Sequence, residues 1–205
     1  MQKLIIVSIA IMLASAATGQ VHSPTLTERA ERDGRVRDIA LPENLSIEDW
    51  DEIIQDSEVI ARVTVLSEES KLSPDEHFVI TDYQARIGEV LKDPGGLLGN
   101  TKSPITISKV GGALQYKGKP IALETPWFPP LERQKSYVVF LGLVNKDVRG
   151  RFGILGFEAG VYCVDGDVAS CMTPNRKVRG QPCGPGTTSL TKSVKEKVSA
   201  QEKAK

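Results

Sequence analysis

Apolar and polar residues alternate along two neighbouring stretches near the middle of the chain. In the first stretch, the apolar side chains occupy every second position: Val59, Ala61, Val63 and Val65. In the second, the same spacing relates Val79, Thr81, Tyr83, Ala85 and Ile87. A period of two is typical of an antiparallel strand with one buried face, because successive side chains point to opposite sides. The connection carries Ser73-Pro74-Asp75, a strong turn former, so the pattern predicts a long β-hairpin.

The rest of the pattern predicts more strands. In the second stretch the alternation slips at Gly88-Glu89, which predicts a β-bulge and a bend. Further strands are expected in residues 105–110, 114–123, 137–144, 152–157 and 161–169. Residues 137–144 are apolar at nearly every position and predict a strand covered on both faces. Helical and strand segments do not alternate regularly, so we expect an all-β, antiparallel fold over residues 45–183.

A short amphipathic helix is predicted just before the hairpin. Ser46 is a suitable N-cap with Asp49 three residues later, and Ile47, Trp50 and Ile54 recur at spacings of three and four. Since a tryptophan in such an apolar stripe is usually part of a core, we expect Trp50 to plug one end of a barrel rather than to stack on a ligand.

The segment that follows residue 19 and the segment at the C-terminus are both polar. Residues 20–44 carry a run of mixed charges and predict a flexible arm, and residues 184–205 predict a disordered basic tail. From Thr173 onward there are eight basic and two acidic residues, whereas residues 20–172 hold 17 basic and 24 acidic ones. An acidic body of this kind argues against nucleic-acid binding.

The first residues have the three parts of a secretory signal peptide. Lys3 supplies a positive charge, residues 4–13 form an apolar run, and residues 14–19 are small. The apolar run is too short to span a membrane stably, so no transmembrane segment is expected. We therefore predict that residues 1–19 are removed, with cleavage before Ala17 or before Gln20, and that the mature protein is secreted or periplasmic.

The chain has three cysteines, Cys163, Cys171 and Cys183, and export permits a disulfide. Asp165-Gly166 predicts a two-residue hairpin turn that places Cys163 opposite Val168. Cys171 then lies on the other face of the sheet from Cys163. We therefore predict a disulfide between Cys171 and Cys183, with Cys163 free. Their spacing is not that of a zinc site, and no histidine lies near them.

Catalytic chemistry has little support in this sequence. The best candidate is His77, next to Asp75 and Glu76, but adjacent strand residues point apart and make poor joint metal ligands. No nucleophile-elbow or phosphate-loop motif accompanies it. We therefore expect no cofactor, no metal and no enzyme. A hydrolase or metal-dependent enzyme that uses His77 and nearby carboxylates is the alternative.

Two aromatic residues are flanked by prolines in the stretch Pro126-Trp127-Phe128-Pro129-Pro130. A loop stiffened by proline can present aromatic side chains to a partner at low entropic cost. Trp127 and Phe128 are therefore the predicted binding residues for a protein, a peptide or an envelope component. The alternative is that both rings fold inward as a lid over one end of the barrel.

Three segments occur in the order expected of one known family: Ser57–Val63, Tyr83–Lys92 and Lys135–Leu141. They resemble secreted bacterial β-barrel proteins that are similar to the netrin-like, metalloproteinase-inhibitor type of OB fold. The resemblance covers about residues 45–168 and implies a small OB-like barrel and export. Inhibitors of that type reach the target's metal with a cysteine at the mature N-terminus, and here no cysteine precedes Cys163. The resemblance therefore implies a fold and a location rather than protease inhibition.

Overall fold

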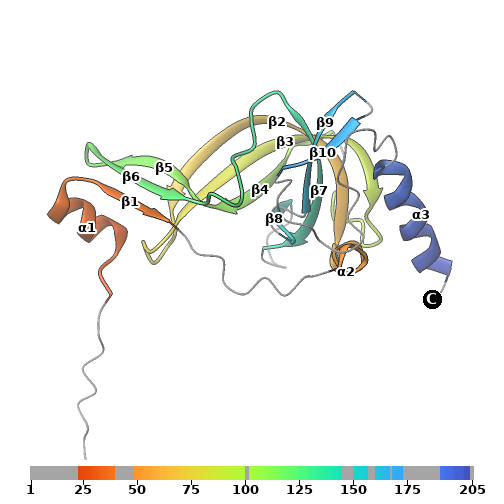
Figure 1. The fold of residues 1–205 in the computed structure, drawn as a ribbon, viewed down its shortest axis with the longest axis horizontal. Helices are drawn as coiled ribbons and strands as arrows, with labels where there is room; N and C mark the ends of the chain where they lie inside the picture. Colours follow the sequence, from red (N-terminus) through yellow and green to blue (C-terminus); the bar gives the residue numbers. More distant parts are fainter. Residues whose placement is uncertain are drawn as a thin grey trace, which may run out of the picture.

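The computed structural model describes residues 23–39, 49–99, 102–144, 150–156, 160–166, 168–172 and 190–203. Within these ranges the chain is mostly β-structure, with ten strands in two sheets and three helices (Figure 1). The all-β class expected from the alternation is confirmed. The smaller sheet lies at one end of an elongated molecule, and two of the helices lie at the other end.

The larger sheet contains β2 (Val59–Leu72), β3 (Val79–Lys92), β4 (Ile105–Val110), β7 (Ser136–Leu143), β8 (Arg151–Ile154), β9 (Val161–Asp165) and β10 (Val168–Cys171). Its strand order is β10–β9–β7–β2–β3–β4–β8, and β7 also pairs with β8. The pairs β2–β3, β3–β4, β4–β8, β8–β7 and β7–β2 therefore form a closed circuit of five strands. The β4–β8 pair is parallel, and the other four pairs are antiparallel.

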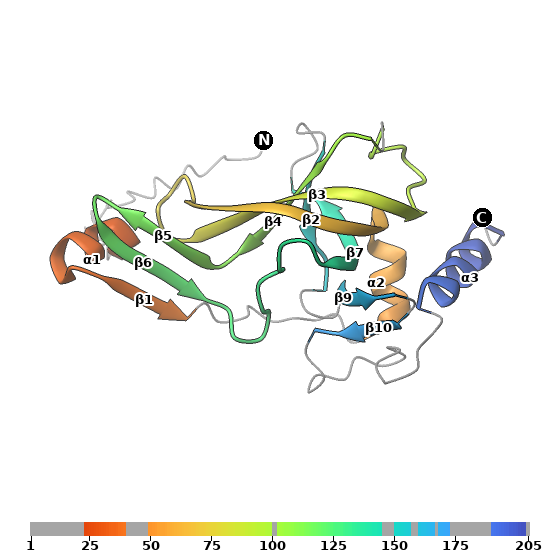
Figure 2. The same cartoon turned by 90° about the horizontal axis from the view of Figure 1, so that it is seen from above.

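The β2–β3 hairpin runs along most of the molecule (Figure 2). Gly88 has no partner on β2, because Arg62 pairs with Glu89 and Val63 pairs with Ile87. The bulge predicted at Gly88-Glu89 is therefore confirmed, and two further register shifts accompany it. Bulges bend a strand and increase its twist, which explains how the hairpin curves from one end of the molecule to the other.

The strands of the circuit bury two different faces. Side chains from all five strands meet in the first hydrophobic cluster, which lies inside the circuit and includes Ala61, Tyr83 and Phe152. The second cluster lies on the outside and includes Phe140 and Tyr162. On β7, residues alternate between the two clusters, so this strand is covered on both faces as predicted.

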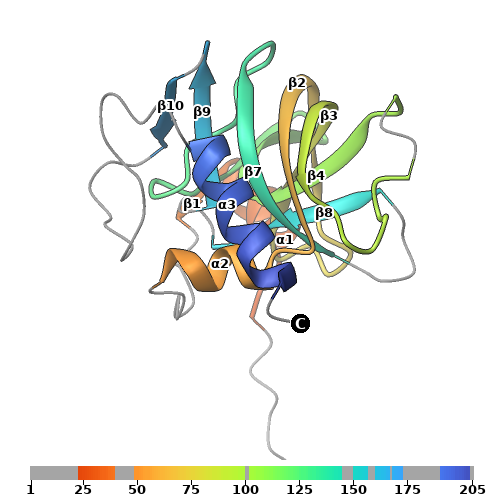
Figure 3. The same ribbon diagram turned by 90° about the vertical axis from the view of Figure 1, so that its right-hand side faces the viewer.

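Helices α2 (Trp50–Asp56) and α3 (Leu190–Lys203) cover the second cluster, and Figure 3 views the molecule from this end. Helix α2 begins after Asp49, whose carboxylate accepts a hydrogen bond from the Asp51 N–H at 2.9 Å. Ser46, the predicted N-cap, lies outside the described residues. The ring of Trp50 packs against Phe140 with 6.1 Å between centroids. Trp50 is therefore buried as predicted, but it covers the outer face of β7 and does not plug the interior.

The prediction of a disordered C-terminal tail is wrong for α3. Leu190, Val194 and Val198 follow one another at intervals of four and are buried in the second cluster. The tail has few apolar residues, but three at helical spacing form one continuous stripe. Tertiary packing of such a stripe stabilises a helix whose composition alone would not.

The prediction of a flexible N-terminal arm over residues 20–44 is also wrong for residues 26–39, which are part of the smaller sheet region. This region contains α1 (Leu26–Asp33), β1 (Val36–Ile39), β5 (Gly112–Tyr116) and β6 (Lys119–Glu124), with sheet order β1–β6–β5. Thr25 and Glu28 form a capping box at the start of α1. The segment folds because Leu26, Ala30 and Val36 are buried in a third hydrophobic cluster with Ile121 and Leu123. Its opposite charges also pair across elements, as Arg29 does with Asp38 and Arg37 with Glu124, each at 2.5 Å.

Candidate functional site

A groove of about 620 Å³ lies between one face of the β2–β3–β4 sheet, the β5–β6 hairpin and the proline-rich loop at 125–130. We call it the Lys109 groove. Its lining residues are Glu68, Ser70, Thr81, Tyr83, Lys109, Gly111, Gly112, Ala113, Ala122, Leu123, Glu124, Thr125, Pro126, Pro129 and Pro130. The groove thus brings together the central hairpin, the smaller sheet and the loop in which the sequence places its candidate binding residues.

Strand register decides which polar side chains reach the groove. Ser70 pairs with Thr81, and Thr81 pairs with Lys109, so the three side chains form one row across β2, β3 and β4. The Thr81 hydroxyl donates to the Gly111 carbonyl at 2.6 Å and lies 2.9 Å from the Ser70 hydroxyl. Since the Thr81 proton is used on Gly111, Ser70 is the donor to Thr81.

Gly112 allows the smaller sheet to approach this row. Its φ is +138°, and a Cβ at this position would lie 2.2 Å from Oγ1 of Thr81 and 2.7 Å from Oγ of Ser70. Both the backbone conformation and the lack of space therefore require glycine. The close contact fixes the start of β5 as a wall of the groove.

Lys109 is the cation of the groove, and only 7% of the residue is exposed. Its Nζ donates to the Thr125 hydroxyl at 2.8 Å and lies 4.7 Å from the centroid of the Phe128 ring. Burial lowers the pKa of Lys109 to about 8. Lys109 forms no salt bridge with any residue that the structure describes, so its charge is stabilised by a hydroxyl and an aromatic ring and not by a carboxylate.

The opposite face of the same sheet carries a complete ionic network around Asp82. Arg151 donates to both carboxylate oxygens at 2.8 and 2.9 Å, Lys71 donates at 2.5 Å and Ser108 donates at 2.6 Å. Burial by itself would raise the pKa of Asp82, but the hydrogen bonds from Lys71 and Ser108 and the charge of Arg151 lower it below its ordinary value. These contacts join β2, β3, β4 and β8, and we interpret the network as structural.

The proline-rich loop closes the groove with its two aromatic residues turned towards the core. Phe128 is buried, with 4% exposed, and belongs to the first hydrophobic cluster. Trp127 is half-buried and packs against the same cluster. This arrangement is that of the lid alternative, in which the prolines, and not the aromatic faces, line the groove. A direct binding role for Trp127 or Phe128 stays a prediction.

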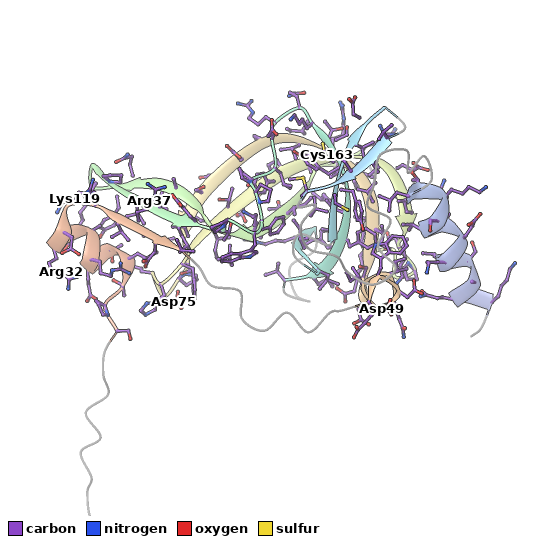
Figure 4. The ribbon with its side chains drawn as sticks, in the orientation of Figure 1. Arg32, Arg37, Asp49, Asp75, Lys119 and Cys163 are labelled. Carbon is purple, nitrogen blue, oxygen red and sulfur yellow. The ribbon has the colours of Figure 1, made fainter. Side chains whose placement is uncertain are left out.

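His77 and its neighbours form the turn at the tip of the β2–β3 hairpin. Asp75 accepts hydrogen bonds from the Ser73 hydroxyl at 2.5 Å and from the His77 N–H at 3.3 Å. The Glu76 carboxylate accepts from the Thr27 hydroxyl, and its carbonyl accepts from the Leu26 N–H at 3.0 Å, so this tip binds the start of α1. Among the described residues, no group of three or more His, Cys, Asp or Glu side chains could hold a metal ion. Figure 4 shows Asp75 at this tip, far from Asp49 at α2.

The cysteines occupy different faces, as the predicted hairpin parity requires. The turn itself is displaced by one residue, because Asp165 pairs with Val168 and Cys163 pairs with Ser170. Cys163 is a free thiol that packs against the first cluster, whereas Cys171 packs against the second. Cys183 lies outside the described residues, so its disulfide with Cys171 stays a prediction.

Lys109 was not predicted as a functional residue, although the sequence contains a signal for it. In the β4 strand, Ile105, Ile107 and Lys109 share one face by alternation, and all three are buried. A lysine on the apolar face of a strand is a departure from the pattern. Such departures are where functional residues are most often found.

The chain matches no protein-family model, and no curated protein gives a significant match.

The signal-peptide prediction falls on residues 1–19, which lie outside the described residues. In the part of the chain that is described, no helix combines the length and the apolar character needed to cross a bilayer.

Proposed function

We propose that this chain is an exported, non-catalytic binding module built on an OB-like barrel, and that the Lys109 groove is its binding site. The barrel is supported by the closed circuit of β2, β3, β4, β8 and β7. Its order, with one parallel pair between the third and last strands, is that of a five-stranded Greek-key barrel. It also agrees with the resemblance to the netrin-like type of OB fold. Export is supported by the charged, apolar and small-residue segments of residues 1–19.

The observation that carries the binding role is a buried cation in a concave site. Burying a charge without a counter-ion costs free energy, and a fold optimised for stability alone would place an apolar residue there. Perturbed ionisable groups that line a cavity are therefore candidates for function. The volume of the groove suits a small ligand or a few residues of a peptide or envelope component.

A substitution that fills the groove tests this proposal. Ala113 on β5 is exposed and lines the groove, and Gln115 lies two residues further on the same face of the same strand without lining it. The mature protein and its Ala113→Trp and Gln115→Trp variants are immobilised and exposed to an extract of the native envelope. We expect the wild type and Gln115→Trp to retain the same components and Ala113→Trp to lose them. Equal retention by all three proteins, or none by the wild type, contradicts the proposal.

The export part of the proposal has its own test. N-terminal sequencing of the material found outside the cytoplasm is expected to begin at Ala17 or Gln20. An intact Met1 in a membrane fraction would show that the leader is not cleaved.

A further inference from the structure

We propose that the Lys109 groove takes an organic ligand with a single carboxylate, which Lys109 binds at the inner end of the groove. This inference rests on the proposed function, because it names the ligand class for the same site. It assigns to Lys109 the counter-ion that the described residues do not supply.

The charges around the groove favour one negative group on the ligand. Lys109 is the one cation among the lining residues, and the other charged residues in this set are Glu68 and Glu124. Glu124 is already paired with Arg37 at 2.5 Å, whereas Glu68 is exposed at the rim. A ligand with several negative charges would be repelled by Glu68 and would find only one cation among the lining residues. Phosphate sites usually offer an arginine fork or the start of a helix, and the lining residues include neither.

The walls of the groove favour an apolar body on the same ligand. Beside the polar residues already described, they include the small or apolar side chains Ala113, Ala122, Leu123, Pro126, Pro129 and Pro130. The volume of about 620 Å³ lies within the range of small-molecule sites, which combine apolar walls with a few convergent polar groups. The Thr125 hydroxyl, which accepts from Nζ at 2.8 Å and donates to the Phe128 carbonyl at 3.0 Å, holds the lysine in place before the ligand arrives.

The affinity of the groove for a carboxylate is expected to depend on pH. A carboxylate binds the ammonium form of Lys109, and the pKa of that group without ligand is about 8. While the ligand stays ionised, its affinity therefore falls as the pH rises through this value, by about tenfold between pH 7 and pH 9. The other titratable groups that line the groove are Glu68, Glu124 and Tyr83. Burial raises the pKa of Tyr83 to about 12, which is above this range.

The experiment compares acids with their neutral amides. Binding to the mature protein is measured by titration calorimetry with 4-phenylbutyrate and 4-phenylbutyramide, and with N-acetyl tetra-alanine bearing a free or an amidated C-terminus. If 4-phenylbutyrate binds more tightly than its amide, the ligand is a free organic acid. If the peptide with the free C-terminus binds more tightly than the amidated peptide, the ligand is a peptide C-terminus. In either case we expect Lys109→Met to lower the affinity for the acid at least tenfold and to abolish the dependence of that affinity on pH. Lys71→Met removes a lysine from the other face and is expected to leave affinity unchanged.

The outcomes separate this inference from the proposed function. If acid and amide bind equally and Ala113→Trp abolishes both, the groove is a binding site but the carboxylate inference is overturned. If the acids bind to Ala113→Trp as tightly as to the wild type, the groove is not the binding site and the inference is overturned. If neither acid binds to the wild type, the inference is overturned as well. A loss in Lys71→Met equal to that in Lys109→Met would show general surface attraction and would likewise overturn it. Thermal unfolding of each variant confirms that it is folded.

Discussion

The two faces of the sheet formed by β2, β3 and β4 treat buried charge in opposite ways. On one face, Asp82 is surrounded by Lys71, Ser108 and Arg151 and all of its charge is matched by donors. On the other face, Lys109 lies at the back of a groove, and the described residues offer it a hydroxyl and an aromatic ring. The contacts on the first face join four strands, whereas the cation on the second face forms no salt bridge with the described residues. This difference is the reason why we interpret the Asp82 network as structural and propose the Lys109 groove as a binding site.

The largest effect is expected at the loop that covers the Lys109 face. Phe128→Ala removes a buried ring from the first cluster and should lower the free energy of unfolding by about 3–5 kcal/mol. Trp127→Ala should cost less, because Trp127 is only half-buried. Chemical denaturation of both variants measures the two values. A smaller loss for Phe128→Ala than for Trp127→Ala would contradict the lid arrangement.

The next largest effect on stability is expected on the face of the sheet that carries Asp82. Asp82→Asn removes the charge that Lys71 and Arg151 share and is expected to destabilise the protein by about 2–3 kcal/mol near pH 7. Because the pKa of Asp82 is lowered in the folded protein, its contribution is present above the ordinary value of 3.8 and is lost as the pH falls through the folded-state pKa. The gap between variant and wild type should therefore narrow in acid. A gap that is independent of pH would show that the charge of Asp82 does not matter.

A substitution of Lys109, on the other face, should change the free energy of unfolding in the opposite direction. Lys109→Met replaces a buried cation with an apolar side chain of similar length and is expected to stabilise the protein by about 1–3 kcal/mol near pH 7. The pKa of Lys109 is lowered to about 8 from 10.5, so the unfolded chain binds more protons between these values. Wild-type stability therefore rises with pH across this range and the advantage of the variant shrinks. Denaturation at pH 7 and at about pH 10 measures both effects, and destabilisation by Lys109→Met at both would make Lys109 a structural residue.

The smallest effect is expected for Lys71→Met. Its side chain is 47% exposed, and Arg151 still binds both oxygens of Asp82 after the change. An exposed ion pair of this kind contributes about 1 kcal/mol or less. Thermal unfolding should show a small decrease or none. A loss as large as that of Asp82→Asn would mean that Lys71 alone stabilises the carboxylate.

The hairpin could be predicted from the sequence because its signals are local. Alternation specifies a strand and its buried face, and Gly88 marks a bulge where the period slips. The same reasoning underestimated both ends of the chain. In α1 and α3 the apolar residues are few, and what stabilises them is the surface on which they pack, such as the second cluster beneath Leu190 and Val194. No local rule reports the presence of that surface.

Taken by itself, the amino-acid order determined the strand faces, the position of the β2–β3 turn and the expectation of a leader peptide, because each depends on residues a few positions apart. Only the tertiary structure decided which strands close into a circuit and that Ser70, Thr81 and Lys109 form one row. It also decided that the proline-rich loop folds over this row and turns Phe128 inward. These contacts join residues far apart in the chain, and burial, which changes the character of Lys109, depends on all of them together.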